Sequence, residues 1–152
     1  PSKPKAPARP NLEKLRERIE KKIYPASKST WSDYKYKEHC SAVCELASKM
    51  MKAEANKGFA ATRDSILIDA FIAVVEPIVE AWDDHYFTGQ GRCGYELSSV
   101  LEEAEEALEK SEDTEDAFAE RGRELRQLCG DLKKKYEKFV GGPLDLYSGS
   151  LF

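Results

Sequence analysis

The stretch Ile66–Phe87 constrains the fold of this chain most, because no other segment is so densely apolar. Read as a helix, it carries apolar side chains over most of its circumference, which is typical of a buried helix. It is also longer than the roughly 4–8 residues of a strand. We therefore expect a central core helix. Its acidic residues share one stripe, formed by Asp69, Glu76, Glu80 and Asp83.

Pro77 lies inside this stretch and removes one backbone hydrogen bond from the helix. We expect either a kink near Ala73–Pro77 or two helices that meet there. Asp69 and Glu76 interrupt the apolar run, so it is too short for a membrane span and we expect no membrane contact.

Apolar residues recur at helical spacing elsewhere, whereas the period-2 alternation of strands is absent over any convincing length. We expect an all-α bundle of about five helices, with the central helix kinked at Pro77 and a long C-terminal helix. Asn11 suits a helix start, and Gly58 and Gly141 suit helix ends. The expected helices cover residues 12–23, 31–57, 62–87, 95–110 and 115–140.

The 152 residues fit one domain flanked by two short segments. Residues 1–10 form a basic, proline-rich linker, residues 11–142 the bundle and residues 143–152 an apolar tail. The linker indicates a domain of a larger protein. The 4 cysteines are too few and too scattered for a disulfide scaffold, so we expect reduced thiols and an intracellular location, cytoplasmic or nuclear.

Charge is segregated along the chain. Residues 1–57 carry 14 basic and 7 acidic side chains, whereas residues 58–120 carry 3 basic and 17 acidic ones. We interpret this as pairing between basic and acidic helices within one fold. A net charge of −4 and acids interleaved along the first helix argue against nucleic-acid binding, apart from weak contacts of the basic linker.

The glycine-rich segment 89–94 matches the dinucleotide-binding pattern G-x-G-x-x-G but lacks its flanking strands. We interpret it as an inter-helix loop. Gly91, Arg92 and Gly94 could still hold an anion at the start of the following helix.

Metal binding and catalysis are the alternatives to a purely structural domain. Cys40 and Cys44 face the same side of a helix, and with His85 and Cys93 they have acceptable zinc chemistry. Their spacing lacks the usual zinc knuckle, so we interpret the cysteines as small core residues and assign no metal or cofactor. Asp83, Asp84, His85 and Cys93 also invite acid–base or nucleophilic roles, but adjacency in sequence alone identifies no catalytic residue.

The sequence features left unexplained by catalysis or metal binding are surface features. They favour a non-enzymatic protein-interaction or scaffold domain that binds a partner peptide or helix. The alternative is a metal-binding or ligand-binding domain, or a small enzyme, around His85 and Cys93. A heptad seam from Phe118 to Phe139 allows a homodimer, although we prefer the flank of an intramolecular bundle. The residues expected to bind a partner are Trp82, Tyr86, Phe87, Leu144, Leu146 and Tyr147.

Overall fold

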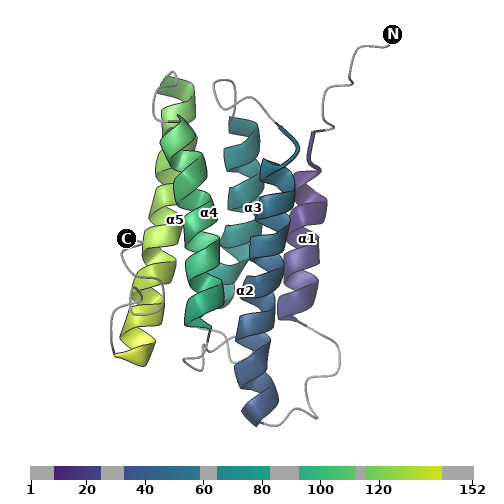
Figure 1. Cartoon of the computed structure of the whole chain (residues 1–152), viewed down its shortest axis with the longest axis vertical. Coiled ribbons are helices and arrows are strands. Elements are labelled where there is room, and N and C mark those ends of the chain that lie inside the picture. Colours follow the sequence, from purple (N-terminus) through teal and green to yellow (C-terminus); the bar gives the residue numbers. More distant parts are fainter. Residues whose placement is uncertain (1–8, 25–32, 59–64, 83–92, 112–115, 142–152) are drawn as a thin grey trace.

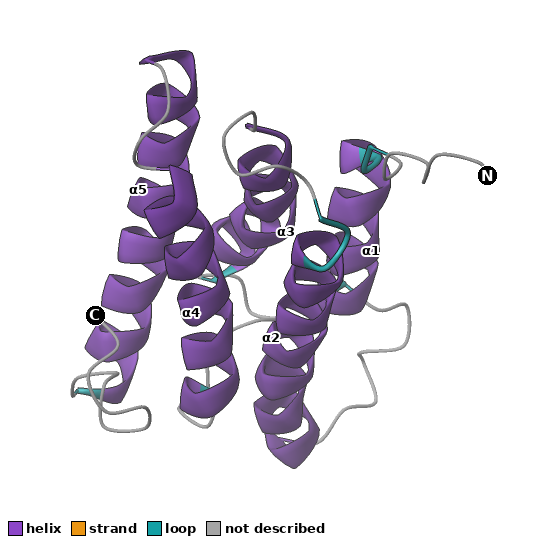
Figure 2. Cartoon of the chain, turned by 45° about the horizontal axis from the view of Figure 1, so that its top comes forward, coloured by secondary structure: helices purple, strands orange, loops and turns teal. Residues whose placement is uncertain are grey.

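The chain forms an all-α bundle, as the sequence predicts (Figure 1). A computed structural model describes residues 9–24, 33–58, 65–82, 93–111 and 116–141, and these residues contain no strand (Figure 2). The helices are α1 (Leu12–Ile23), α2 (Asp33–Ala55), α3 (Ser65–Ala81), α4 (Gly94–Ser111) and α5 (Asp116–Val140). In the described part of the chain, no helix is long and apolar enough to cross a membrane.

Local chemistry fixes several helix ends. The side chain of Asn11 accepts a hydrogen bond from the backbone N–H of Lys14 at 3.1 Å, which caps the first turn of α1. Gly58 and Gly141 follow α2 and α5 with φ of 79° and 74°, a left-handed conformation that favours glycine. The predicted roles of these three residues are therefore confirmed.

The central helix α3 contacts each of the other four helices, and α1 and α5 lie on opposite sides of it (Figure 1). Its apolar side chains, among them Phe71, Val74 and Ile78, are buried, as the dense apolar pattern predicts. The helix continues through Pro77 without interruption, so the alternative of two separate helices is wrong. The kink at Pro77 stays a prediction.

Arginines from neighbouring helices pair with the acidic stripe of α3. Arg16 on α1 reaches Glu76 at 2.6 Å and Glu80 at 2.5 Å. Arg121 on α5 reaches Asp69 at 2.5 Å. These contacts confirm that segregated charges pair within the fold. Because the paired side chains are 25–56% exposed, each pair contributes about 1 kcal/mol or less and mainly fixes how α1 and α5 sit on α3.

The predicted seam of α5 faces the interior of the bundle. Leu125, Leu132 and Tyr136 are fully buried, and α5 packs against both α3 and α4. The preferred interpretation, an intramolecular flank, is confirmed for these residues. The side chains of Phe118 and Phe139 lie outside the described set, and a homodimer through the seam stays a prediction.

Gly122 in this seam provides a test of packing. A Cβ at this position would lie 3.5 Å from Leu108 Cδ2, which is ordinary van der Waals contact. We therefore expect Gly122→Ala to raise the free energy of unfolding by about 1 kcal/mol through helix propensity, as measured by urea denaturation. Gly141→Ala is the opposing control, since its positive φ makes alanine unfavourable by about 1 kcal/mol. A loss of stability in Gly122→Ala would contradict this packing.

Candidate metal centre

Helices α2 and α4 bring together three of the four cysteines. The two helices share the most extensive contact between any pair of helices in the described chain, and they lie side by side in both ribbon views (Figures 1 and 2). Cys40 and Cys44 are one turn apart on α2 and project from the same face. Cys93 directly precedes α4 and accepts a backbone hydrogen bond from Leu97 at 2.8 Å, so it occupies the N-cap position.

The three sulfur atoms converge on one point. All Sγ atoms of Cys40, Cys44 and Cys93 lie within 4.8 Å of one another, and the Sγ of Cys40 donates to that of Cys93 at 2.9 Å. All three thiols are free, and each is at most 1% exposed. We call these three residues the thiol cluster. It lies within the hydrophobic core, out of reach of bulk water.

Hydrogen bonds distribute protons unequally within the thiol cluster. Hydrogen bonds from Cys40 and Cys44 lower the pKa of Cys93 to about 5, and its N-cap position acts in the same direction. The pKa of Cys44 is raised by its hydrogen bonds to Cys40 and Cys93 and by burial. The pKa of Cys40 is raised overall. The hydrogen bond with Cys44 lowers this pKa, but the hydrogen bond to Cys93, burial and nearby negative charges together raise it by more. The geometry thus supports one thiolate stabilised by two neutral thiols.

Glu96 adds a fourth acidic group beside the thiol cluster. It lies three residues after Cys93 on α4, and its negative charge contributes to the raised pKa of Cys40. Its Oε2 is buried and has no hydrogen-bond partner among the described residues. A buried acceptor without a partner is unfavourable by about 1–3 kcal/mol. None of the main influences on the three thiol pKa values comes from a basic side chain.

The remaining cysteine and the described histidine are not part of the thiol cluster. His39 precedes Cys40 but donates its Nε2–H to the carbonyl of Ile23 at 3.0 Å, which ties α2 to α1. Cys129 lies on α5 among apolar side chains, and burial raises its pKa to about 12. His85, the fourth candidate ligand predicted from the sequence, lies outside the described residues.

The interpretation of the cysteines as buried core residues is therefore confirmed, but it is incomplete. The i,i+4 spacing of Cys40 and Cys44 was the signal for a shared face. Cys93 joins them only through the docking of α4 against α2, which no local pattern encodes. Three of the four candidate ligands are brought together, and Glu96, which the sequence did not single out, lies beside them.

The other predicted sites are differently placed. Trp82 is 3% exposed and packs edge-on against Tyr136, with ring centroids 6.4 Å apart. It is thus a core residue in this structure and offers no surface to a partner, because its indole fills the space between α3 and α5. Gly94 of the anion site is the buried first residue of α4. The residues that lie outside the described part are Tyr86, Phe87, Gly91, Arg92, Leu144, Leu146 and Tyr147.

Comparisons with known proteins add no assignment. No model of a protein family matches this chain, and neither a curated protein nor a solved structure matches it.

The core position of Trp82 can be tested by truncation. We expect Trp82→Ala to lower the free energy of unfolding by about 3–5 kcal/mol, because it removes a large buried side chain and leaves a cavity. Tyr95→Ala is the matched control, since Tyr95 is 69% exposed and its loss should change stability by less than about 0.5 kcal/mol. Equal effects of the two changes in urea denaturation would show that Trp82 is not core.

Proposed function

We propose that this domain binds one thiophilic d¹⁰ cation, Zn²⁺ or Cu⁺, through Cys40, Cys44 and Cys93. The observation that carries the proposal is the convergence of three thiols from two helices, with all Sγ atoms within 4.8 Å. Thiolate is the ligand that Zn²⁺ and Cu⁺ prefer among protein side chains. The sequence allows this function as the alternative to a protein-interaction domain.

The sulfur separations suit an ion at their centre. Zn–S bonds of about 2.3 Å in tetrahedral geometry place sulfur atoms about 3.8 Å apart. The thiol cluster spans up to 4.8 Å, and the sulfur atoms of Cys40 and Cys93, 2.9 Å apart, would separate by about 0.9 Å to accept the ion. Rotation about side-chain torsions achieves shifts of this size without moving either helix.

Charge also favours a cation at this position. Two of the three thiols remain protonated without one, because a second buried thiolate would repel the first. Binding of Zn²⁺ would release two protons, so the net charge of the thiol cluster and Glu96 stays the same while a cation replaces the protons as the partner of the sulfur atoms. An ion held by buried ligands from both helices would brace α2 against α4, as structural metal sites do.

Zn²⁺ and Cu⁺ make different demands on Glu96. Zn²⁺ takes four ligands, so it needs a donor besides the three thiolates. The described candidate is Glu96, whose charge acts on Cys40 but whose carboxylate lies outside the group of ligand atoms within 4.8 Å, so it would have to turn toward the ion. Cu⁺ is satisfied by three thiolates. Glu96→Gln should therefore weaken Zn²⁺ binding by about 10-fold to 100-fold, an effect typical of lost supporting ligands, and leave Cu⁺ binding nearly unchanged.

Metal affinity provides the test. Reduced, metal-free protein is titrated with Zn²⁺ and separately with Cu⁺, each in competition with a chromophoric chelator. We expect one equivalent to bind, and Cys40→Ser, Cys44→Ser and Cys93→Ser each to weaken binding by at least about 100-fold. Cys129→Ser is the matched control, since it removes a buried cysteine outside the thiol cluster, and it should bind as the unmodified chain does.

Thermal unfolding makes the test independent of any one variant. A ligand at 100 times its dissociation constant stabilises the folded state by about 2.7 kcal/mol, which raises the Tm of a domain of this size by roughly 5–11 °C. Far-UV circular dichroism verifies that each metal-free variant is folded. Failure of both ions to bind, or equal loss of binding in Cys129→Ser, would overturn the proposal.

A further inference from the structure

The sulfur atoms of Cys40 and Cys93 lie at a distance that is close to two different chemical states. They are 2.9 Å apart, and the Sγ of Cys40 donates a hydrogen bond to that of Cys93. A disulfide bond of about 2.05 Å requires an approach of about 0.9 Å, and joint coordination of a metal at about 3.8 Å requires a separation of similar size. Rotation about the side-chain torsions is sufficient for either change.

Helix geometry favours a disulfide between α2 and α4 over one within α2. The Cβ atoms of residues four apart on a helix are about 5–6 Å apart, whereas a disulfide holds its two Cβ atoms about 3.5–4.5 Å apart. Cys40 and Cys44 therefore cannot be joined without distortion of α2. Cys93 comes from the start of α4, so its approach to Cys40 is set by helix packing and not by the helical repeat.

Cys93 has the surroundings of the more reactive sulfur. It occupies the N-cap position of α4, where the helix dipole stabilises a negative charge, and it accepts the hydrogen bond from Cys40. The thiolate is the form of cysteine that acts as a nucleophile. Because the thiol cluster is at most 1% exposed, an oxidant reaches it through local opening of the helix ends, which favours a small, uncharged molecule.

We propose that a small peroxide converts Cys40 and Cys93 into a reversible disulfide, a modification that excludes the metal ion from the thiol cluster. The Cys93 thiolate attacks one oxygen of the peroxide, the O–O bond breaks, and hydroxide leaves. The Sγ of Cys40 then attacks the sulfur of the Cys93 sulfenic acid. An S–S bond forms, the S–O bond breaks, and the proton of Cys40 leaves with the hydroxyl group as water. The two sulfur atoms together lose two electrons, which the peroxide gains.

The disulfide and the bound cation are alternative states of the thiol cluster. The sulfur atoms of a disulfide carry no negative charge, so oxidation leaves Cys44 as the single thiol of the cluster for the ion. A bound ion in turn occupies the Cys93 thiolate that must attack the peroxide. This exclusion rests on the proposed metal function, whereas formation of the disulfide in the metal-free chain does not.

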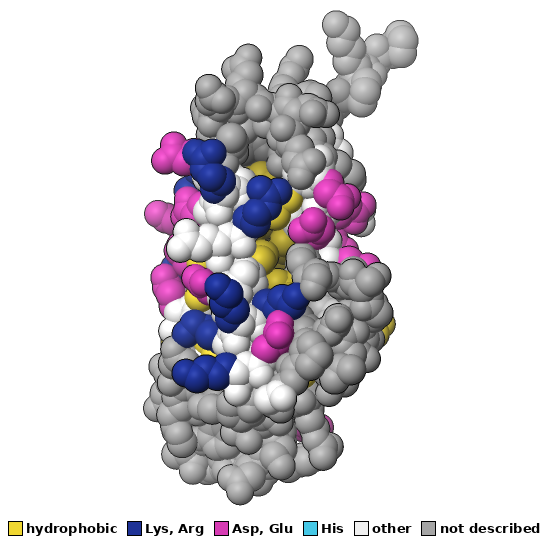
Figure 3. All heavy atoms as spheres, turned by 90° about the vertical axis from the view of Figure 1, so that its left-hand side faces the viewer, with side chains coloured by type: hydrophobic (Ala, Val, Ile, Leu, Met, Phe, Trp, Pro, Cys, Tyr) yellow, Lys and Arg dark blue, Asp and Glu magenta, His cyan; other side chains and the backbone are white. Residues whose placement is uncertain are grey.

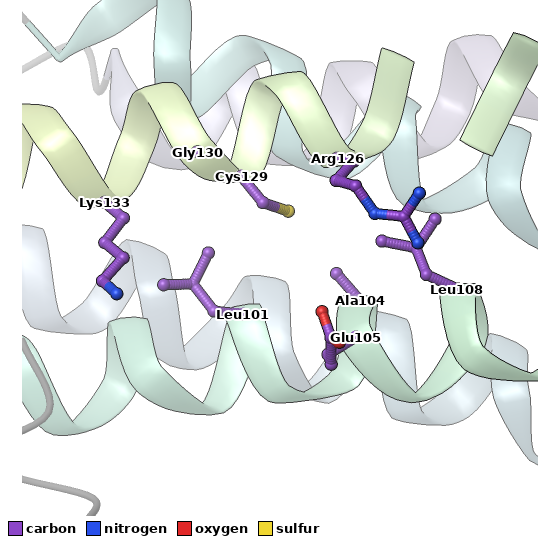
Figure 4. Close-up of a pocket in the computed structure, with 8 residues that line it drawn as sticks. All are labelled: Leu101, Ala104, Glu105, Leu108, Arg126, Cys129, Gly130 and Lys133. Carbon is purple, nitrogen blue, oxygen red and sulfur yellow. The ribbon is translucent and has the colours of Figure 1, made fainter. Parts of the chain in front are cut away.

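Cys129 is an internal control, because it is the more accessible cysteine but lies outside the thiol cluster. Its sulfur points into a groove between α4 and α5, beside Ala104 and Leu108 (Figure 4), and the residue is 6% exposed. On this side of the molecule, apolar atoms reach the surface between basic and acidic side chains (Figure 3). Access alone would therefore direct a peroxide to Cys129, whereas the chemistry of the thiol cluster directs it to Cys93.

Mass spectrometry of the reduced, metal-free chain after exposure to hydrogen peroxide is the test. We expect two of the four free thiols to disappear, with tandem spectra that link Cys40 to Cys93, and dithiothreitol should restore both. Cys129 should remain a thiol. Cys93→Ala should slow the loss of thiols at least about tenfold, whereas Cys44→Ala and Cys129→Ala should still form the disulfide. Far-UV circular dichroism verifies that each variant is folded.

Loading with zinc separates this inference from the metal proposal. In the zinc-loaded chain, we expect the disulfide to form at least about tenfold more slowly and the ion to be released as it forms. Failure of zinc to bind, together with normal disulfide formation in the metal-free chain, would reject the metal proposal alone. Equal rates with and without bound zinc would reject the exclusion.

Three results in the folded, metal-free chain would contradict the disulfide itself. The first is oxidation of Cys129 before any cysteine of the thiol cluster, which would show that access decides. The second is conversion of Cys93 to a sulfinic acid that dithiothreitol does not reverse. The third is a disulfide that joins Cys93 to Cys44 instead of Cys40.

Discussion

The burial of α3 is the physical constraint on which the rest of the structure depends. A helix that is apolar over most of its circumference must be covered on nearly every side, and α1, α2, α4 and α5 provide that cover. Its one polar stripe lies where Arg16 and Arg121 reach over from α1 and α5. Covering α3 also sets the outer helices against one another, α2 beside α4 and α4 beside α5. The thiol cluster lies at the first of these junctions.

The junction of α2 and α4 combines a packing role with a chemical one. Cysteine is a small apolar residue when protonated, so Cys40, Cys44 and Cys93 let two helices approach closely without leaving a cavity. The same closeness brings their sulfur atoms within reach of a single ion. Occupancy of such a site by a metal would stabilise the interface that already has the most extensive contact, rather than create a new one.

Much of this architecture could be predicted from sequence, because its determinants are local. Apolar periodicity locates the helices, Asn11, Gly58 and Gly141 mark their ends, and the opposite charges of α1 and α3 indicate that the two pair. The candidate site could be predicted only in part. Cys40 and Cys44 share a helical face by spacing alone, but the approach of Cys93 depends on how α4 docks across some fifty intervening residues. The role of Trp82 could not be predicted from sequence. An aromatic residue at a helix end can bind a partner or pack in the core, and the contact with Tyr136 places Trp82 in the core.

X-ray absorption spectroscopy of the metal-loaded protein tests the central claim most directly. Coordination by Cys40, Cys44 and Cys93 predicts three sulfur scatterers at about 2.3 Å from a zinc ion, with one lighter oxygen or nitrogen scatterer completing the shell. A copper(I) sample should show the sulfur atoms alone. A first shell made only of oxygen and nitrogen, or the same sulfur shell after Cys93→Ser, would contradict coordination by the thiol cluster.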